Sequence, residues 1–192
     1  IIMFIVWLLC LDDLTAFEIK TFKFEHLTLS DGFSSMRVIC IYQDRRGFLW
    51  FGTSAGLDRF DGYEVKEFLF EPDDSTSISH SQTNAITQDD KGSIWFATGY
   101  AGLNKLRADG ESFYQIRHDA DDDRSLGGDA LDAVFFDHRK NLWIGARKGG
   151  GLNRLLYDST RTASKNNCAF ERFRHDPDDP ATISSNNIRT IY

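Results

Sequence analysis

The side chains best suited to bind a small molecule lie in short polar segments between runs of apolar residues. Tyr100 could stack on the face of a sugar ring, and Arg147 or Lys148 could hold a carboxylate or a sulfate through charge-assisted hydrogen bonds. Further polar side chains that we expect near them are His80, Asn84 and Asn187. For each of these six residues, the alternative interpretation is an ordinary solvated loop residue.

Support for catalysis or metal binding is weak by comparison. Of the five histidines, His118 and His175 occupy equivalent positions of a repeated linker, which indicates a structural role rather than a unique active site. The aspartate runs of these linkers lack the central Gly and the closing Glu of an EF-hand calcium loop, so turn and capping chemistry explains them better. The runs are Asp73-Asp74, Asp121-Asp122-Asp123 and Asp178-Asp179. We therefore predict no catalytic residue, no metal and no cofactor in this chain.

The composition is that of an acidic globular protein. The 192 residues carry a formal net charge of −7, with 14% aromatic and 27% charged side chains, which is typical of a chain that forms a packed core. No concentrated basic face is apparent, so nucleic-acid binding is not expected. The three cysteines, Cys10, Cys40 and Cys168, fit neither a metal-ligand pattern nor a disulfide framework. We expect Cys40 to be a small buried hydrophobe.

A repeated motif supplies the elements that must position the candidate residues. Each copy places an Asp six residues before a Trp, and successive Trp residues of the repeat are 45 and 48 residues apart. The repeated positions are Asp44, Gly47, Trp50 and Gly52, then Asp89, Gly92 and Trp95, then Asp137, Trp143 and Gly145. Because three of the four Trp residues occupy one position of a repeat, we assign them a structural role.

Each copy is predicted to fold as four short strands in a meander. The predicted strands are 38–42, 48–53, 57–60 and 63–70, then 84–88, 93–98, 103–106 and 112–117, then 130–136, 141–146, 152–156 and 169–174. Repeats of this length predict an all-β fold, a β-propeller of four-stranded antiparallel blades, of which about three are present. Consecutive apolar residues such as Leu49-Trp50-Phe51 indicate that both faces of the second strand are buried between blades. The loops after these strands share one face with the blade-to-blade connections, and that face carries the candidate residues.

The number of repeats in the sequence determines how we divide the chain into predicted parts. A closed propeller needs at least about four blades, so we interpret the sequence as the N-terminal piece of a longer protein. Its predicted parts are a signal peptide truncated at its start (1–16), an N-terminal strand closing the last blade (17–33), blade 1 (34–77), blade 2 (78–125), blade 3 (126–182) and the start of a fourth blade (183–192). The apolar run Ile1–Leu11 is too short to span a bilayer and suits a signal peptide, the alternative being a buried first strand.

The first repeat, from Gln43 to Gly62, resembles the two-component regulator propeller family. The pattern Asp-x-x-Gly-x-[Leu/Ile]-Trp is in register in all the copies, although the third has Lys140 in place of the turn Gly, so that its turn is expected to differ. Phe24-Glu25-His26-Leu27 and Asp31-Gly32-Phe33-Ser34 look like the start of the family's propellers just after the signal peptide. The resemblance extends from about residue 22 to residue 192.

This resemblance implies a periplasmic sensor region of an inner-membrane signalling protein, with seven-bladed rings when complete. It implies an oligosaccharide or other small ligand, a cytoplasmic histidine kinase or diguanylate cyclase absent from this fragment, and a homodimer in the full receptor. The fragment itself is expected not to be an enzyme. Two alternatives stay open: a secreted propeller glycosidase or lyase, which would need a singular carboxylate pair in the central funnel, and a structural propeller that binds proteins.

Overall fold

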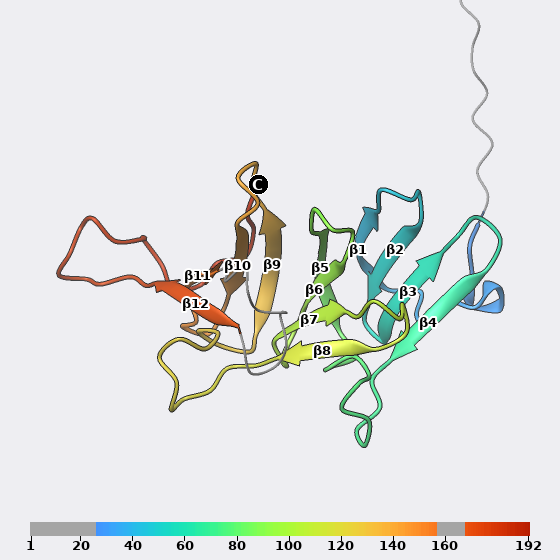
Figure 1. Cartoon of the computed structure of the whole chain (residues 1–192), viewed down its shortest axis with the longest axis horizontal. Coiled ribbons are helices and arrows are strands. Elements are labelled where there is room, and N and C mark those ends of the chain that lie inside the picture. Colours follow the sequence, from blue (N-terminus) through green and yellow to red (C-terminus); the bar gives the residue numbers. More distant parts are fainter. Residues whose placement is uncertain (1–25, 157–167) are drawn as a thin grey trace, which may run out of the picture.

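Three antiparallel sheets of four strands each stand side by side in chain order (Figure 1). The computed structural model describes residues 26–156 and 168–192. Blade 1 consists of β1 (Val38–Gln43), β2 (Leu49–Thr53), β3 (Gly56–Phe60) and β4 (Val65–Leu69), blade 2 of β5 (Thr83–Gln88), β6 (Ile94–Thr98), β7 (Leu103–Leu106) and β8 (Phe113–Ile116), and blade 3 of β9 (Leu131–Phe136), β10 (Leu142–Ala146), β11 (Leu152–Leu156) and β12 (Ala169–Phe173). The predicted all-β fold of four-stranded propeller blades is confirmed, with strand ends shifted by one or two residues.

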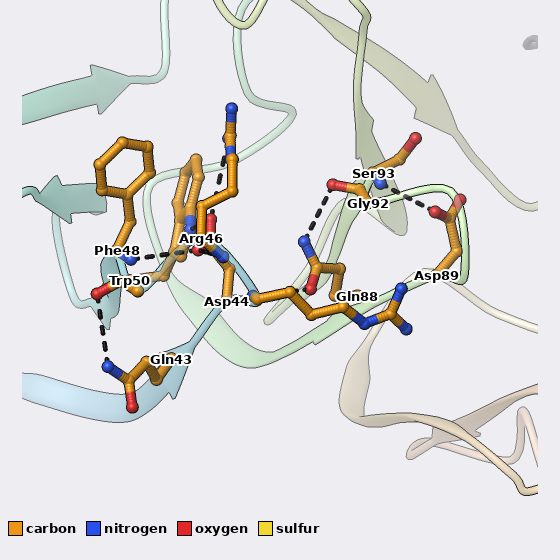
Figure 2. Close-up of polar contacts among 11 residues, drawn as sticks. Gln43, Asp44, Arg46, Phe48, Trp50, Gln88, Asp89, Gly92 and Ser93 are labelled. Atoms are coloured by element: carbon orange, nitrogen blue, oxygen red, sulfur yellow. Dashed lines mark hydrogen bonds and ion pairs between the residues drawn. The ribbon is translucent and has the colours of Figure 1, made fainter.

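The hydrogen bond between the repeated Asp and Trp explains the fixed spacing of the motif. Trp50 Nε1 donates to Asp44 Oδ2 at 3.0 Å, and the pairs Trp95–Asp89 and Trp143–Asp137 have the same geometry at the same distance (Figure 2 shows the first pair). The other carboxylate oxygen of Asp44 accepts the backbone N–H groups of Arg46 and Phe48 at 2.9 and 3.1 Å. One aspartate therefore closes the hairpin turn and also fixes the orientation of the indole ring.

The turns themselves are alike in all three blades. Gly47 lies at φ +93° and donates its N–H to Asp44 O at 2.9 Å, a left-handed position that glycine adopts at little cost. In blade 3, Lys140 adopts φ +66° and makes the equivalent bond to Asp137 O at 2.9 Å. The expectation that this turn differs is therefore wrong. Asp137 Oδ1 accepts two backbone N–H groups of the turn, and these bonds hold Lys140 in its unfavourable conformation.

The core of the arc lies between neighbouring blades. β1 packs against β5, and β5 packs against β9. Trp50 is fully buried in the cluster between blades 1 and 2, and Trp95 in the cluster between blades 2 and 3. Trp143 is half-buried, because no further blade among the described residues covers it. The predicted burial of the second strand on both faces is thus confirmed where two blades meet.

A small residue after the Trp is required by this packing. An added Cβ on Gly52 would lie 2.9 Å from the carbonyl oxygen of Thr83 in blade 2, closer than real Cβ contacts. In addition, a cation on the third strand lies over each repeated Trp ring, and the distances to the ring centroid are 4.7–5.8 Å. These pairs are Arg59–Trp50, Lys105–Trp95 and Arg154–Trp143. Each Trp is thus held by an Asp at its indole N–H and by a cation over its ring.

Polar contacts connect the β1–β2, β5–β6 and β9–β10 hairpins at one edge of the blades. This edge lies opposite the blade-to-blade connections (Figure 1). Gln88 Oε1 accepts the N–H of Arg45 from blade 1 at 3.1 Å, while Gln88 Nε2 donates to Gly92 O at 3.0 Å (Figure 2). On the other side of blade 2, Lys140 Nζ lies 2.8 Å from Asp90 Oδ2. These contacts connect the hairpins of neighbouring blades at this edge.

The expectation for the N-terminal end needs correction. The strand expected over residues 17–33 is not formed at its described residues, because Thr28 and Asp31 cap a short 3₁₀-helix, η1 (Leu29–Asp31). The helix ends at Gly32, which has a left-handed φ of +96°. Residues 183–192 form no strand, but Ile188 donates its N–H to Ala146 O of blade 3 at 2.9 Å. That these residues begin a fourth blade stays a prediction.

Several other expectations fall outside the described residues, namely the signal peptide at 1–16, residues 17–25 of the predicted strand, and Cys10. No helix among the residues that the structure covers is long and apolar enough to cross a bilayer. Cys40 is half-buried against the core between blades 1 and 2. Burial raises the pKa of its thiol to about 12, so Cys40 behaves as a small hydrophobe, as predicted.

Blade 1 differs from the other blades at one buried position of its third strand. Asn104 in blade 2 accepts the N–H of Ser79 with Oδ1 and donates through Nδ2 to Ser79 Oγ. The equivalent Asp58 accepts both the N–H and the hydroxyl of Ser34 with Oδ2, while its buried Oδ1 has no hydrogen-bond partner. Burial raises the pKa of Asp58 to about 6, because removal from water disfavours the charged form of a carboxyl group.

The Asp–Trp bond predicts a difference between Trp95 and Trp143. Trp95→Phe removes the indole N–H and leaves Asp89, which is 2% exposed, short of a donor, so we expect the free energy of unfolding to fall by about 1–3 kcal/mol. Trp143→Phe should cost less, because Asp137 also accepts from Asn141 Nδ2 and lies near water. Urea unfolding measures both. Equal losses at the two positions would contradict the structural role assigned to the buried bond.

Asp58 predicts a specific dependence of stability on pH. Its pKa in the fold, about 6, lies above its usual value, so its contribution to stability is fully present below about pH 4 and is lost as the pH rises through 6. Asp58→Asn removes the buried charge and should raise the free energy of unfolding by about 1–3 kcal/mol at pH 8, with no gain at pH 4. Asn104→Asp is the matched control and should introduce the same pH dependence in blade 2. A pH-independent effect of Asp58→Asn would rule this interpretation out.

Candidate functional site

Four of the six candidate residues gather where the loops of blades 2 and 3 meet. Tyr100 follows β6, His80 precedes β5, and Arg147 and Lys148 follow β10. The Arg147 guanidinium carbon and Lys148 Nζ each lie 5.0 Å from the centroid of the Tyr100 ring. The centroid of the His80 ring lies 5.3 Å from that of Tyr100. We call Tyr100, His80, Arg147 and Lys148 the loop cluster.

An aromatic row leads into this cluster. The ring of Phe70, at the end of blade 1, stacks on His80 with 6.5 Å between centroids and 24° between planes. His80 in turn is tilted by 50° against Tyr100. Tyr100 is 51% exposed and Phe70 is 38% exposed, so the row forms part of the molecular surface. It therefore offers apolar ring area next to two cations, a combination that suits an amphipathic ligand.

Arg147 joins the loops of two blades. Its Nη2 donates to Gly99 O of blade 2 at 2.8 Å, and its Nε lies 3.4 Å from Asp132 Oδ1 of blade 3. Asn84 supports this arrangement from β5, because its Nδ2 donates to Asp132 Oδ1 at 3.1 Å and to Leu131 O at 2.8 Å. The Asn84 side chain therefore forms hydrogen bonds between blades 2 and 3 and positions Asp132.

Lys148, which lies over the Tyr100 ring, has an unusual backbone conformation. Its φ is +54°, in the left-handed region that a lysine seldom occupies, and Gly149 follows at +88°. The turn is closed by the N–H of Gly150, which donates to Arg147 O at 3.2 Å. Side chains in such conformations concentrate at binding sites. The ammonium group of Lys148 is exposed above Tyr100, where a ligand can reach it.

His80 is held in its neutral form. Its Nδ1 accepts the N–H of Gln82 at 3.0 Å, so Nε2 carries the hydrogen. Burial, followed by the positive charge of Arg117, lowers the pKa of His80 below its usual value of 6.5. A neutral ring with a free Nε2–H can donate one hydrogen bond to a ligand oxygen.

Asn187 does not join the cluster. It is exposed on the far side of blade 3 and donates its N–H to Ser185 Oγ at 3.1 Å. Conversely, Phe70, Arg117 and Asp132 lie around the cluster and were not predicted. Arg117 had a detectable signal, because Arg117-His118-Asp119 recurs as Arg174-His175-Asp176. Phe70 and Asp132 belong to no such recurring pattern.

The aspartate-rich linkers are built from turns. Asp74 Oδ1 accepts the N–H and the hydroxyl of Thr76, and Asp119 Oδ1 accepts the N–H of Asp121 at 3.0 Å. The prediction of turn and capping chemistry is therefore confirmed. Within residues 26–156 and 168–192, no group of three or more His, Cys, Asp or Glu side chains is placed to hold a metal ion.

Comparison with known proteins gives the fold a functional context. The sequence profile described as two component regulator propeller matches residues 32–55. The extracellular domain of a B. thetaiotaomicron protein assigned as a hybrid two component system covers 78% of this chain with a TM-score of 0.67 and 28% identity. A histidine kinase of Formosa agariphila is 48% identical over 60 residues, which is 31% of this chain. The predicted resemblance to the two-component regulator propeller family is thus confirmed, and the chain is similar to the sensor propellers of hybrid two-component systems.

These relatives are much longer than the chain. It spans 4% of the F. agariphila histidine kinase and 20% of the B. thetaiotaomicron extracellular domain. Virginiamycin B lyase from Staphylococcus aureus has a related fold over 77% of this chain, with a TM-score of 0.53 and 16% identity. At that identity the likeness concerns the fold alone.

The environment of His80 predicts a measurable titration. Because the folded pKa is lowered, the neutral ring stabilises the fold above the usual pKa, and this stability is lost as the pH falls through the lowered value. In an NMR titration, His80 should therefore titrate below pH 6.5. Arg117→Gln should raise its midpoint, and Arg174→Gln, the equivalent change in blade 3, should leave it in place. If the His80 titration midpoint were unchanged in Arg117→Gln, the guanidinium would not act on this ring.

Proposed function

We propose that this chain is the ligand-sensing propeller of a membrane signal-transduction protein and lies outside the cytoplasm, in the periplasm. The observation that carries the proposal is the 28% identity, over 78% of the chain, to the extracellular domain of a hybrid two component system. The local identity of 48% to a histidine kinase supports the same role. In this proposal the signal passes to a cytoplasmic kinase, or to a diguanylate cyclase, in the same protein.

The loop cluster is the proposed ligand site, and an oligosaccharide or another small ligand is its proposed occupant. Exposed aromatic area next to hydrogen-bond donors is the usual composition of a site for such ligands. The cluster lies on the edge formed by the β6–β7 and β10–β11 loops and the connection between β4 and β5. No specific observation favours the alternative propeller enzyme, since the lyase likeness is one of fold.

The arrangement suggests how binding could be transmitted. Tyr100 and His80 belong to blade 2, whereas Arg147 and Lys148 belong to blade 3. A ligand that contacts both pairs stabilises one relative position of the two blades and so shifts the protein toward that state. Arg147 already connects the two loops through Gly99 O, so a small movement of either loop reaches the other blade.

The remaining blades of the ring are the proposed partners of the open side of blade 1. Cys40 and Tyr42 of β1 pack against the core shared with blade 2, while Ile39 and Ile41, which alternate with them, are 38% and 62% exposed. A neighbouring blade would bury these two side chains, and each burial would stabilise the fold by about 1.5–3 kcal/mol. We further propose that the full receptor is a homodimer, as expected for a sensor that activates a kinase.

The proposed function is tested with the full-length protein in lipid vesicles. Oligosaccharide digests of several polysaccharides are added to the propeller side, and ATP-dependent phosphorylation of the protein is followed. We expect at least one digest to change the rate, and Tyr100→Ala to abolish that response without changing the rate in the absence of sugar. If no digest changes phosphorylation or binds the protein, the sensor function is wrong.

A further inference from the structure

We propose that the loop cluster recognises an anionic group, so that the ligand is an acidic saccharide bearing a carboxylate or a sulfate. This inference rests on the proposed function, because it assumes that the cluster is the site of a saccharide. It goes further by assigning the chemical class of the ligand. It also assigns different roles to the members of the cluster: Lys148 and Arg147 bind the anion, and Tyr100 positions them.

The first argument is the occupancy of the Tyr100 ring. Arg147 and Lys148 each lie 5.0 Å from its centroid, and the His80 centroid lies 5.3 Å away. Three groups of the chain thus already contact this ring, which leaves less of its surface for a sugar. The quadrupole of the ring instead attracts both cations, so that the ring holds two positive charges close together. The geometry therefore favours binding through the charges over stacking on the ring.

The second argument is the charge balance of this surface. Asp132 lies beside Arg147 and offsets one positive charge. Lys148 makes no ion pair with any residue in the described part of the chain. Arg117 donates to the neutral oxygens of Ser79 and Gln115. The cluster and its surroundings thus keep an excess of positive charge in a chain whose formal net charge is −7, and this local excess attracts an anion.

The third argument is that the donors are held in place before a ligand arrives. The Arg147 guanidinium is fixed by Gly99 O at 2.8 Å and by Asp132 at 3.4 Å. The ammonium group of Lys148 lies over the ring at 5.0 Å, on a residue whose backbone is left-handed at φ +54°. Donors with restricted motion lose less entropy on binding. A carboxylate or sulfate that approaches Lys148 from solvent can also accept from the free Nε2–H of His80.

The inference is tested by calorimetric titration of the full-length protein with three disaccharides. Digalacturonate supplies carboxylates, sulfated neocarrabiose supplies a sulfate, and cellobiose supplies neither. We expect at least one acidic disaccharide to bind about tenfold more tightly than cellobiose, and the two acidic arms distinguish the carboxylate from the sulfate. The preference should weaken as salt increases, because exposed charges are screened.

Variants assign the effect to the cluster. Lys148→Gln should weaken binding of the preferred acidic disaccharide about tenfold. Its matched control is Lys140→Gln, which alters another left-handed lysine of blade 3 at the opposite edge and should leave binding unchanged. Tyr100→Phe keeps the ring and should retain the affinity, whereas Tyr100→Leu removes it and should lose the preference for the acidic disaccharide.

The outcomes separate this inference from the proposed function. Equal binding of cellobiose and the acidic disaccharides, equal effects of Lys148→Gln and Lys140→Gln, or no binding in either acidic arm would each overturn the inference. In those cases a phosphorylation response to neutral oligosaccharides would leave the sensor function intact. A response to acidic digests that Lys148→Gln abolishes and Lys140→Gln preserves would support both.

Discussion

The hydrogen bond from a Trp indole to an Asp carboxylate is the interaction on which the rest of the structure depends. It occurs at 3.0 Å in every blade. The same aspartate closes the β1–β2 type of hairpin, so turn geometry and ring orientation are set together. The oriented ring then fills the space between neighbouring blades, where Trp50 and Trp95 are fully buried. Because burial of such rings dominates the energy of the core, the spacing of the blades follows from this one contact.

Blade spacing in turn decides which loops can meet. Arg147 spans from blade 3 to Gly99 O of blade 2, and Asn84 ties β5 to Asp132 of blade 3. The loop cluster therefore exists only because the blades are held at this distance. The repeated Asp and Trp residues make the same hydrogen bond in each of the three blades, whereas the loops that follow them differ from blade to blade. Such a division suits a sensor, since specificity can change in the loops while the stacked strands stay constant.

The repeat made most of the fold predictable from sequence, because burial on both faces leaves a continuous apolar signature at Trp50 and Trp95. The edge that carries the loop cluster was predictable from the strand order, because the loops after the second strands and the blade-to-blade connections share one edge. The residues that surround the loop cluster were not predictable. Phe70 and Arg117 lie beside His80, and Asp132 lies beside Arg147, but these three residues come from other elements and share no pattern with the cluster. The turn at Lys140 was mispredicted. The hydrogen bonds that the Asp137 side chain accepts stabilise a left-handed conformation that usually favours glycine over lysine. Local capping by Thr28 and Asp31 likewise overrode a short alternating pattern.

The central claim is that a saccharide binds across the loops of blades 2 and 3, and hydrogen exchange of the full-length protein tests it most directly. With a saturating oligosaccharide that alters phosphorylation, the account predicts slower exchange of the backbone N–H groups in segments 99–102 and 147–150, which carry Tyr100 and Lys148. Exchange at the opposite edge, in the turns at Gly47 and Gly92, should be unchanged. Protection confined to other segments, with both loops exchanging as in the free protein, would contradict the account.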